Sequence, residues 1–119
     1  MAVRKPVIQN VVLENGSLTA TVDLRQGVDD GRGTTTPENI VMVYQGNSLI
    51  DGTETLDVQG YALGNDTVIT ALLVSQITVA ASNVVKVDLS TAAKGCWKLL
   101  FTADALTAGE EISISILTW

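Results

Sequence analysis

The sequence predicts an all-β fold, a β-sandwich or jelly-roll-like arrangement of about eight antiparallel strands. Three observations predict it. Val, Thr and Ile number 15, 14 and 8 of the 119 residues, and β-branched side chains favour strands over helices. Apolar and polar residues alternate in short segments separated by turn signals, which is typical of sandwiches rather than βαβ units. The length suits one hydrophobic core, so we expect residues 1–119 to form a single domain.

The first predicted pair of strands covers residues 7–14 and 18–24, on either side of Asn15-Gly16. Asn-Gly supplies the two residues of positive φ that a type I′ hairpin turn requires. The sequence therefore predicts a hairpin whose second strand is half-buried, with one apolar face made by Leu18, Ala20, Val22 and Leu24.

Two segments differ from the rest of the chain. Residues 1–6 carry Arg4 and Lys5 before Pro6 and are expected to form a basic N-terminal arm. Residues 25–39 contain three Gly, one Pro and a single aliphatic residue, so we expect a long polar loop. Loops of this length without secondary structure are uncommon in compact domains and are usually functional or ordered by a partner.

The middle of the chain predicts a second hairpin, with strands at 40–44 and 49–50 around a turn at 45–48. A short strand follows at 56–58. Residues 67–80 are the longest strand candidate, and both of its faces are largely apolar. This pattern predicts a central strand covered on both sides, or one bent across the sandwich, with part of its surface available to another subunit.

The remaining predicted strands are 84–89, 96–102 and 111–118, the last two joined by a connector, 103–110, with room for one helical turn. Trp97, Leu99 and Phe101 share one face of their strand and are expected in the core. Cys96 lies on the other face and is expected to be a small packing residue.

Charge and composition exclude several function classes. The net charge of −6 disfavours direct nucleic-acid binding. The chain has no His, which removes the commonest general base and metal ligand. A single Cys cannot form an internal disulfide, and neither a signal peptide nor a membrane span is predicted, so cytoplasmic synthesis is the default expectation.

Acidic residues are expected to play structural roles. The spacing of Asp51, Glu54 and Asp57 predicts side chains on alternating faces, which favours a solvated acidic edge over a catalytic carboxylate pair. The segments 29–31 and 64–66 are each expected to be ordinary turns rather than Ca²⁺ sites. We therefore expect no catalytic residue, metal or cofactor, and hence no enzyme.

The sequence instead suggests contacts with a partner. Residues expected to make them come from the basic arm, the long loop and the final position of the sequence. An Arg between two glycines in the loop can reach a carboxylate, and Trp is enriched at the centres of interfaces. Trp119 is expected either to fold over the edge of the sandwich or to insert into a neighbouring subunit. The candidate partner-binding residues are Arg4, Lys5, Arg25, Arg32 and Trp119.

The chain resembles the small decoration, or cement, proteins of tailed bacteriophage capsids. The resemblance is carried by the Val/Thr/Ala-rich β pattern without His, the basic arm at Arg4-Lys5-Pro6, the Gly/Thr-rich segment 31–36 and the ending at 106–116. It implies a protein of the virion that binds the major capsid protein on the outside of an assembled shell, often as a homotrimer. No functional residue carries over from it.

Three other functions remain open from the sequence. A tail or head-to-tail connector subunit has the same composition. A non-catalytic carbohydrate-binding module would need a stacking platform, which Tyr44, Tyr61, Trp97 and Trp119 do not obviously form. An enzyme using Asp51, Glu54 or Asp57 is the least favoured reading.

Overall fold

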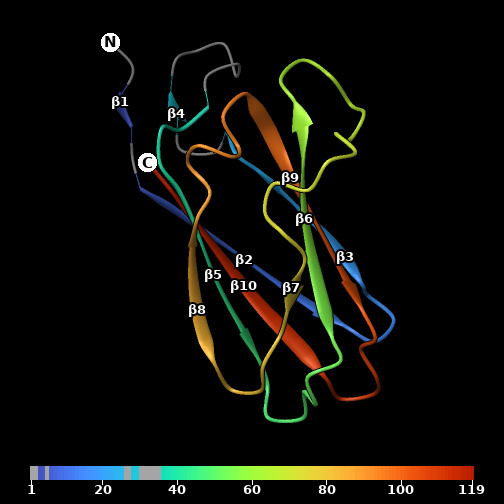
Figure 1. Cartoon of the computed structure of the whole chain (residues 1–119). Helices are drawn as coiled ribbons and strands as arrows, with labels where there is room; N and C mark the ends of the chain where they lie inside the picture. Colours follow the sequence, from blue (N-terminus) through green and yellow to red (C-terminus); the bar gives the residue numbers. More distant parts are fainter. Residues whose placement is uncertain (1–2, 5, 26–27, 30–35) are drawn as a thin grey trace.

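A computed structural model describes residues 3–4, 6–25, 28–29 and 36–119. These residues form an all-β structure of two packed antiparallel sheets, which confirms the predicted fold class (Figure 1). No described segment is a helix that could cross a membrane. The strands are β1 (Val3–Arg4), β2 (Val7–Glu14), β3 (Thr19–Asp23), β4 (Val28–Asp29), β5 (Ile40–Gly46), β6 (Thr55–Ala62), β7 (Ile77–Thr78), β8 (Val84–Asp88), β9 (Cys96–Asp104) and β10 (Glu111–Thr118).

The sandwich consists of one sheet in the order β2-β10-β5-β8 and a second in the order β3-β9-β6-β7. Alternate residues of each strand point into the space between the sheets. In β10 this alternation buries Ile112, Ile114 and Ile116. The largest buried side chains facing them from the other sheet are Leu56, Leu99 and Phe101.

The turn at Asn15-Gly16 forms, but the predicted hairpin does not. Glu14 and Ser17 exchange backbone hydrogen bonds of 3.0 and 2.9 Å, and then β2 enters one sheet while β3 enters the other. Gly16 has a φ of 92° whereas Asn15 is not among the residues of positive φ, so the turn is not type I′. The reason for the separation is that each strand has its own apolar face, and the two faces meet across the core.

The second predicted hairpin is also wrong. Residues 49–50 form no strand, because the chain after β5 crosses from the first sheet to the second. The short strand expected at 56–58 lies in the first half of β6, which is placed between β9 and β7. The strands expected at 84–89, 96–102 and 111–118 correspond to β8, β9 and β10.

The long strand expected over 67–80 is reduced to the two residues of β7. The preceding segment follows the edge of β6 through widely spaced bonds, from Ile69 N–H to the Gly60 carbonyl and from Leu73 N–H to the Val58 carbonyl, both 2.8 Å. Both faces of this segment are apolar because its apolar side chains are divided between the core and the surface. Leu73 and Val74 pack against the core, whereas Ile69 and Leu72 are partly exposed. The connector after β9 is a bend and a turn, with Ala105 at a φ of 67°, rather than a helical turn.

A β-bulge at the start of β9 reverses the predicted sides of Trp97 and Cys96. Tyr61 pairs with Lys98 and Ala62 pairs with Cys96, so Trp97 is the additional residue. Cys96 consequently points into the core with an exposure of 3%, whereas Trp97 is only half-buried. Cys96 is a packing residue as expected, and burial raises the pKa of its thiol.

Gly60 is required by this packing, because a Cβ atom at that position would lie 2.5 Å from the Cys96 Sγ. We predict that Gly60→Ala lowers the free energy of unfolding by about 1–3 kcal/mol, the usual cost of overpacking a core. Cys96→Ala removes the clashing sulfur. In the Cys96→Ala background, Gly60→Ala should therefore lower the free energy of unfolding much less than it does in the unmodified chain. Urea unfolding of the four proteins measures this coupling. Independent, additive effects would contradict it.

Candidate functional site

The strands run lengthwise, so the connections gather at two ends of the sandwich. We call the end where β2 and β5 begin and β3, β8 and β10 finish the arm end (Figure 1). The other end, which carries the connections 15–18, 47–54 and 105–110, is the turn end. Arg4, Arg25 and Trp119, which are the described partner-binding candidates, all lie at the arm end. The sequence does not predict that they share one end of the sandwich.

The basic arm and the long loop pair with each other at the arm end. β1 and β4 form a two-stranded antiparallel sheet of their own, with Val3 opposite Asp29 and Arg4 opposite Val28 (Figure 1). Within the predicted loop, Val28 and Asp29 thus form a strand with the arm, while the other described residues, 25 and 36–39, belong to no strand. Lys5 and Arg32 lie outside the described residues.

Arg25 lies immediately after β3, against the outer surface of the second sheet. Its guanidinium carbon is 4.4 Å from the centre of the Trp97 ring. The same guanidinium donates to both carboxylate oxygens of Asp23, at 3.2 and 2.9 Å. This hydrogen bonding holds the pKa of Asp23 below its usual value.

Lys98 and Tyr61 complete the group around Trp97. The Lys98 Nζ lies 4.2 Å from the Tyr61 ring centre and 4.6 Å from the Trp97 ring centre, and the two rings are 6.1 Å apart. Trp97 Nε1 donates a 2.7 Å hydrogen bond to the Asn65 carbonyl, which fixes the indole. We call Arg25, Tyr61, Trp97 and Lys98 the Trp97 platform. It is a rigid aromatic surface bearing two cations.

The sequence pattern predicts Trp97 in the core and therefore does not reveal this platform. Strict alternation with Leu99 and Phe101 predicts burial of Trp97, and only the bulge moves its ring outward. The positions of Arg25 and Lys98 follow from the pairing of Asp23 with Lys98 across β3 and β9, a long-range register that no local signal specifies.

Trp119 extends β10 rather than folding over the sandwich edge. Its backbone exchanges hydrogen bonds of 3.0 and 3.1 Å with Asn39. Because Thr118 is buried, alternation places both Leu117 and Trp119 on the outer side of the sheet. Trp119 is 39% exposed. Insertion into a neighbouring subunit stays a prediction.

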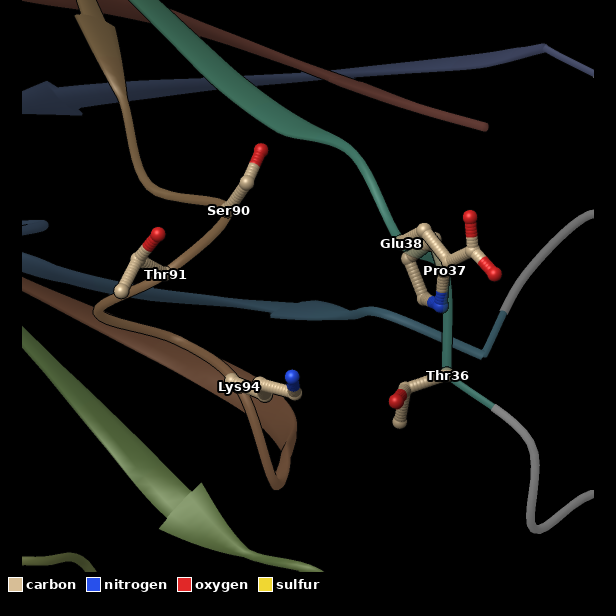
Figure 2. Close-up of a pocket in the computed structure, with 6 residues that line it drawn as sticks. All are labelled: Thr36, Pro37, Glu38, Ser90, Thr91 and Lys94. Atoms are coloured by element: carbon tan, nitrogen blue, oxygen red, sulfur yellow. The ribbon is translucent and has the colours of Figure 1, made fainter.

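A polar cavity of about 530 Å³ also lies at the arm end. Figure 2 shows Thr36, Pro37 and Glu38 on one wall and Ser90, Thr91 and Lys94 on the other. The Ser90 hydroxyl already bonds the backbone of Ile40. The described lining of the cavity thus offers hydroxyls and two opposite charges, and these described residues include no cluster of nucleophile and base.

A buried acidic cluster occupies the turn end. Carboxylate oxygens of Asp51, Glu54 and Glu110 lie within 4.8 Å of one another, and this is the described group that could hold a cation. Glu54 is fully buried and Glu110 nearly so, at 4% exposure. The predicted solvated edge of Asp51, Glu54 and Asp57 is therefore wrong for Glu54, because the chain folds its side chain inward beneath the turn. Asp57 instead lies on the second sheet, bonded to Gln76.

The oxygens of this cluster already have partners in the protein. Glu54 accepts the backbone N–H groups of Asp51 and Gly52, and Glu110 accepts the N–H and hydroxyl of Thr107 at 2.6 and 2.7 Å. Burial, followed by hydrogen bonds to Glu110 and Asp51, raises the pKa of Glu54. The Thr107 backbone lowers the pKa of Glu110. Burial therefore favours the neutral form of Glu54 beside the carboxyl groups of Asp51 and Glu110.

The two ends differ in charge. The turn end carries Glu14, Asp51, Glu54, Asp104, Glu110 and Glu111, with no Lys or Arg among the described side chains there. Arg25, Lys94 and Lys98 belong to the arm end, where acidic residues are also present. The arm end is thus the side better suited to a negatively charged partner surface.

No protein-family model matches the chain, and no curated protein matches it. Among solved structures, the chain is similar to a chain in a structure of infectious bursal disease virus, Gx strain, with a TM-score of 0.42 and 12% sequence identity. The similarity covers 99% of this chain and 31% of that chain, so this chain spans about a third of the viral chain's length. Fold and site define the protein as an antiparallel β-sandwich with a two-stranded ribbon at one end.

The acidic cluster predicts a pH-dependent stability. Folded Glu54 keeps its proton at pH values where the unfolded chain has released it. Its stabilising contribution is therefore complete below the ordinary pKa of 4.5 and is lost as the pH rises through the raised pKa. In that window the free energy of unfolding should fall by up to about 1.4 kcal/mol per pH unit.

Glu54→Gln mimics the protonated side chain, so its urea unfolding between pH 5 and 8 should lack this fall. Glu111→Gln, an exposed change at the same end, should keep it. An unchanged pH slope in the Glu54→Gln protein would contradict the assignment of the proton.

Proposed function

We propose that the chain is a structural protein of a virus particle, which binds the outer surface of an assembled bacteriophage capsid and stabilises it as decoration or cement proteins do. Its partner in this proposal is the major capsid protein, and it acts without catalysis or a cofactor. It would be made in the host cytoplasm and reside on the capsid exterior.

The observation that carries the proposal is the gathering of the arm, the loop strand and the Trp97 platform at one end of a sandwich. A rigid two-layer core is a suitable support for such contacts, since its strands fix the platform residues in one geometry. The resemblance to decoration proteins supplies the identity of the partner. The excess of carboxylates at the turn end supports docking by the arm end, with the turn end toward solvent.

Self-association would strengthen this attachment. Several copies of a modest contact raise the overall affinity through effective concentration, provided that all copies reach their sites together. The resemblance to decoration proteins implies a homotrimer, and native mass measurement counts the copies.

The Trp97 platform also bears on the carbohydrate-binding alternative. A sugar needs an open ring face for stacking, whereas Arg25 and Lys98 both lie within 4.6 Å of the Trp97 ring centre. We therefore favour capsid binding. A tail or connector subunit would use the same kind of contacts, and it differs by assembling into rings or tubes in the absence of shells.

Binding to empty shells of the major capsid protein tests the proposal. Purified chain should sediment with the shells and saturate at a fixed ratio to the capsid subunits. Arg25→Gln should weaken this binding by about tenfold or more, because it removes a charged contact from the interface.

Glu111→Gln is the matched control, since it also replaces one charged side chain by Gln but lies at the turn end. It should bind like the unmodified chain. Absence of saturable binding would refute the proposed function, and equal losses in both variants would refute docking through the arm end.

A further inference from the structure

The outer face of the β2-β10-β5-β8 sheet carries few charges away from the turn end, where Glu14 and Glu111 lie on it. The strand registers align its outward residues in three rows across the four strands, running from Ile8 to Asp88, from Asn10 to Lys86 and from Val12 to Val84. Six of these twelve positions are aliphatic. Ile8, Val12 and Val84 are 64%, 47% and 60% exposed.

The charges in these rows are confined to one strand. Lys86 and Asp88 both lie on the edge strand β8, and the positions on β2, β10 and β5 in the three rows are uncharged. The outer face of the other sheet differs, since Asp23, Asp57 and Lys98 lie within its corresponding rows. An exposed sheet face with so few charges is typical of a surface that contacts another protein.

The positions of the two charges favour a second copy of the same chain as the partner. Consider two copies packed face to face about a two-fold axis. The axis lies in the plane of the interface, perpendicular to the strands, and runs between the first and second rows. Asp88 of each copy then lies opposite Lys86 of the other, and Val41 lies opposite Val43. All other facing positions in these two rows are uncharged.

The charge difference between the ends selects the same arrangement. In this antiparallel packing, the acidic turn end of one copy lies beside the arm end of the other. A two-fold axis parallel to the strands would instead bring two turn ends together and place Ile8 opposite Asp88. Like charges brought together at an interface are unfavourable, so the antiparallel arrangement is preferred.

We propose that the chain forms a two-fold symmetric dimer through the outer face of the β2-β10-β5-β8 sheet, with Lys86 of each copy paired to Asp88 of the other. Trp119 lies just beyond the first row and meets the third row of the other copy. An isologous contact of this kind joins copies in pairs. It does not depend on capsid binding and gives a dimer where the family resemblance implies a trimer.

The size of the face predicts a reversible dimer. Four strands about 4.8 Å apart and about eight residues long give a patch of roughly 19 by 25 Å. This lies below the roughly 800 Å² per partner of standard stable interfaces, even though the side-chain relief adds area. Self-association should therefore depend on protein concentration.

Sedimentation velocity over a concentration series, without any shell present, tests the dimer. Lys86→Glu places Glu opposite Asp88 twice, and Asp88→Lys places Lys opposite Lys86 twice, so each variant alone should dimerise at least tenfold more weakly. An equimolar mixture of the two variants has complementary charges at both contacts and should dimerise nearly as well as the unmodified chain. Asp88 also accepts the Ser90 N–H, and recovery in the mixture excludes misfolding as the cause of the loss.

The apolar part of the face has its own matched pair. Val43→Glu should abolish the dimer, whereas Leu100→Glu, a half-buried aliphatic position facing outward from the other sheet, should leave it intact. A chain that stays monomeric at every concentration, a mixture that does not recover, or a Leu100→Glu variant equally impaired would overturn the inference. Each of these results leaves the shell-binding test unaffected.

Discussion

Each strand of the two four-stranded sheets has one apolar face, and the only way to remove all of these faces from water is to stack the sheets. Leu13, Met42 and Ile114 from the first sheet and Leu56, Leu99 and Phe101 from the second are almost completely buried by this stacking. At about 25 cal/mol for each Å² of apolar surface, such burial is the dominant favourable term in folding. The remaining features of the molecule are positioned by it.

Stacking forces the chain to change sheets at its tight connections, and this collects different chemistry at the two ends. The turn end acquires the buried Glu54 and its acidic neighbours. The arm end acquires the β1–β4 pair and the Trp97 platform. Stacking also leaves two outer faces. The three rows around Val43 on one face carry charges only on β8, while the face containing Lys98 has charges on all three of its longer strands. A molecule with two distinct ends and two distinct faces is suited to specific attachment.

The sequence predicts the strands well wherever one face is apolar and the other polar. Residues 111–118 alternate Ile with Ser, and β10 has the predicted bounds. Alternation contains no information about which sheet a strand joins, so the turn at Asn15-Gly16 is predicted as a hairpin although it connects two layers. Residues 67–80 fail for a related reason, because side chains that line a sheet edge produce the same apolar pattern as a central strand.

The predicted site depends on the same distinction. Arg25 and Trp119, which the sequence predicts to contact a partner, both lie at the arm end, and that role stays a prediction. Trp97 is missed because a single bulge at the start of β9 reverses its side. The burial of Glu54 is missed for a different reason. Glu110, which shares its buried cluster, is more than fifty residues away along the chain, so no local spacing connects the two.

The central claim is that the chain attaches to its partner through the arm end. Amide hydrogen exchange of the chain, free and bound to shells, tests it most directly. The account predicts slower exchange on binding in β1, β4 and the first residues of β9, with unchanged exchange in the 105–110 connection. Protection confined to the turn end, or bound chains with unchanged exchange at the arm end, would contradict the account.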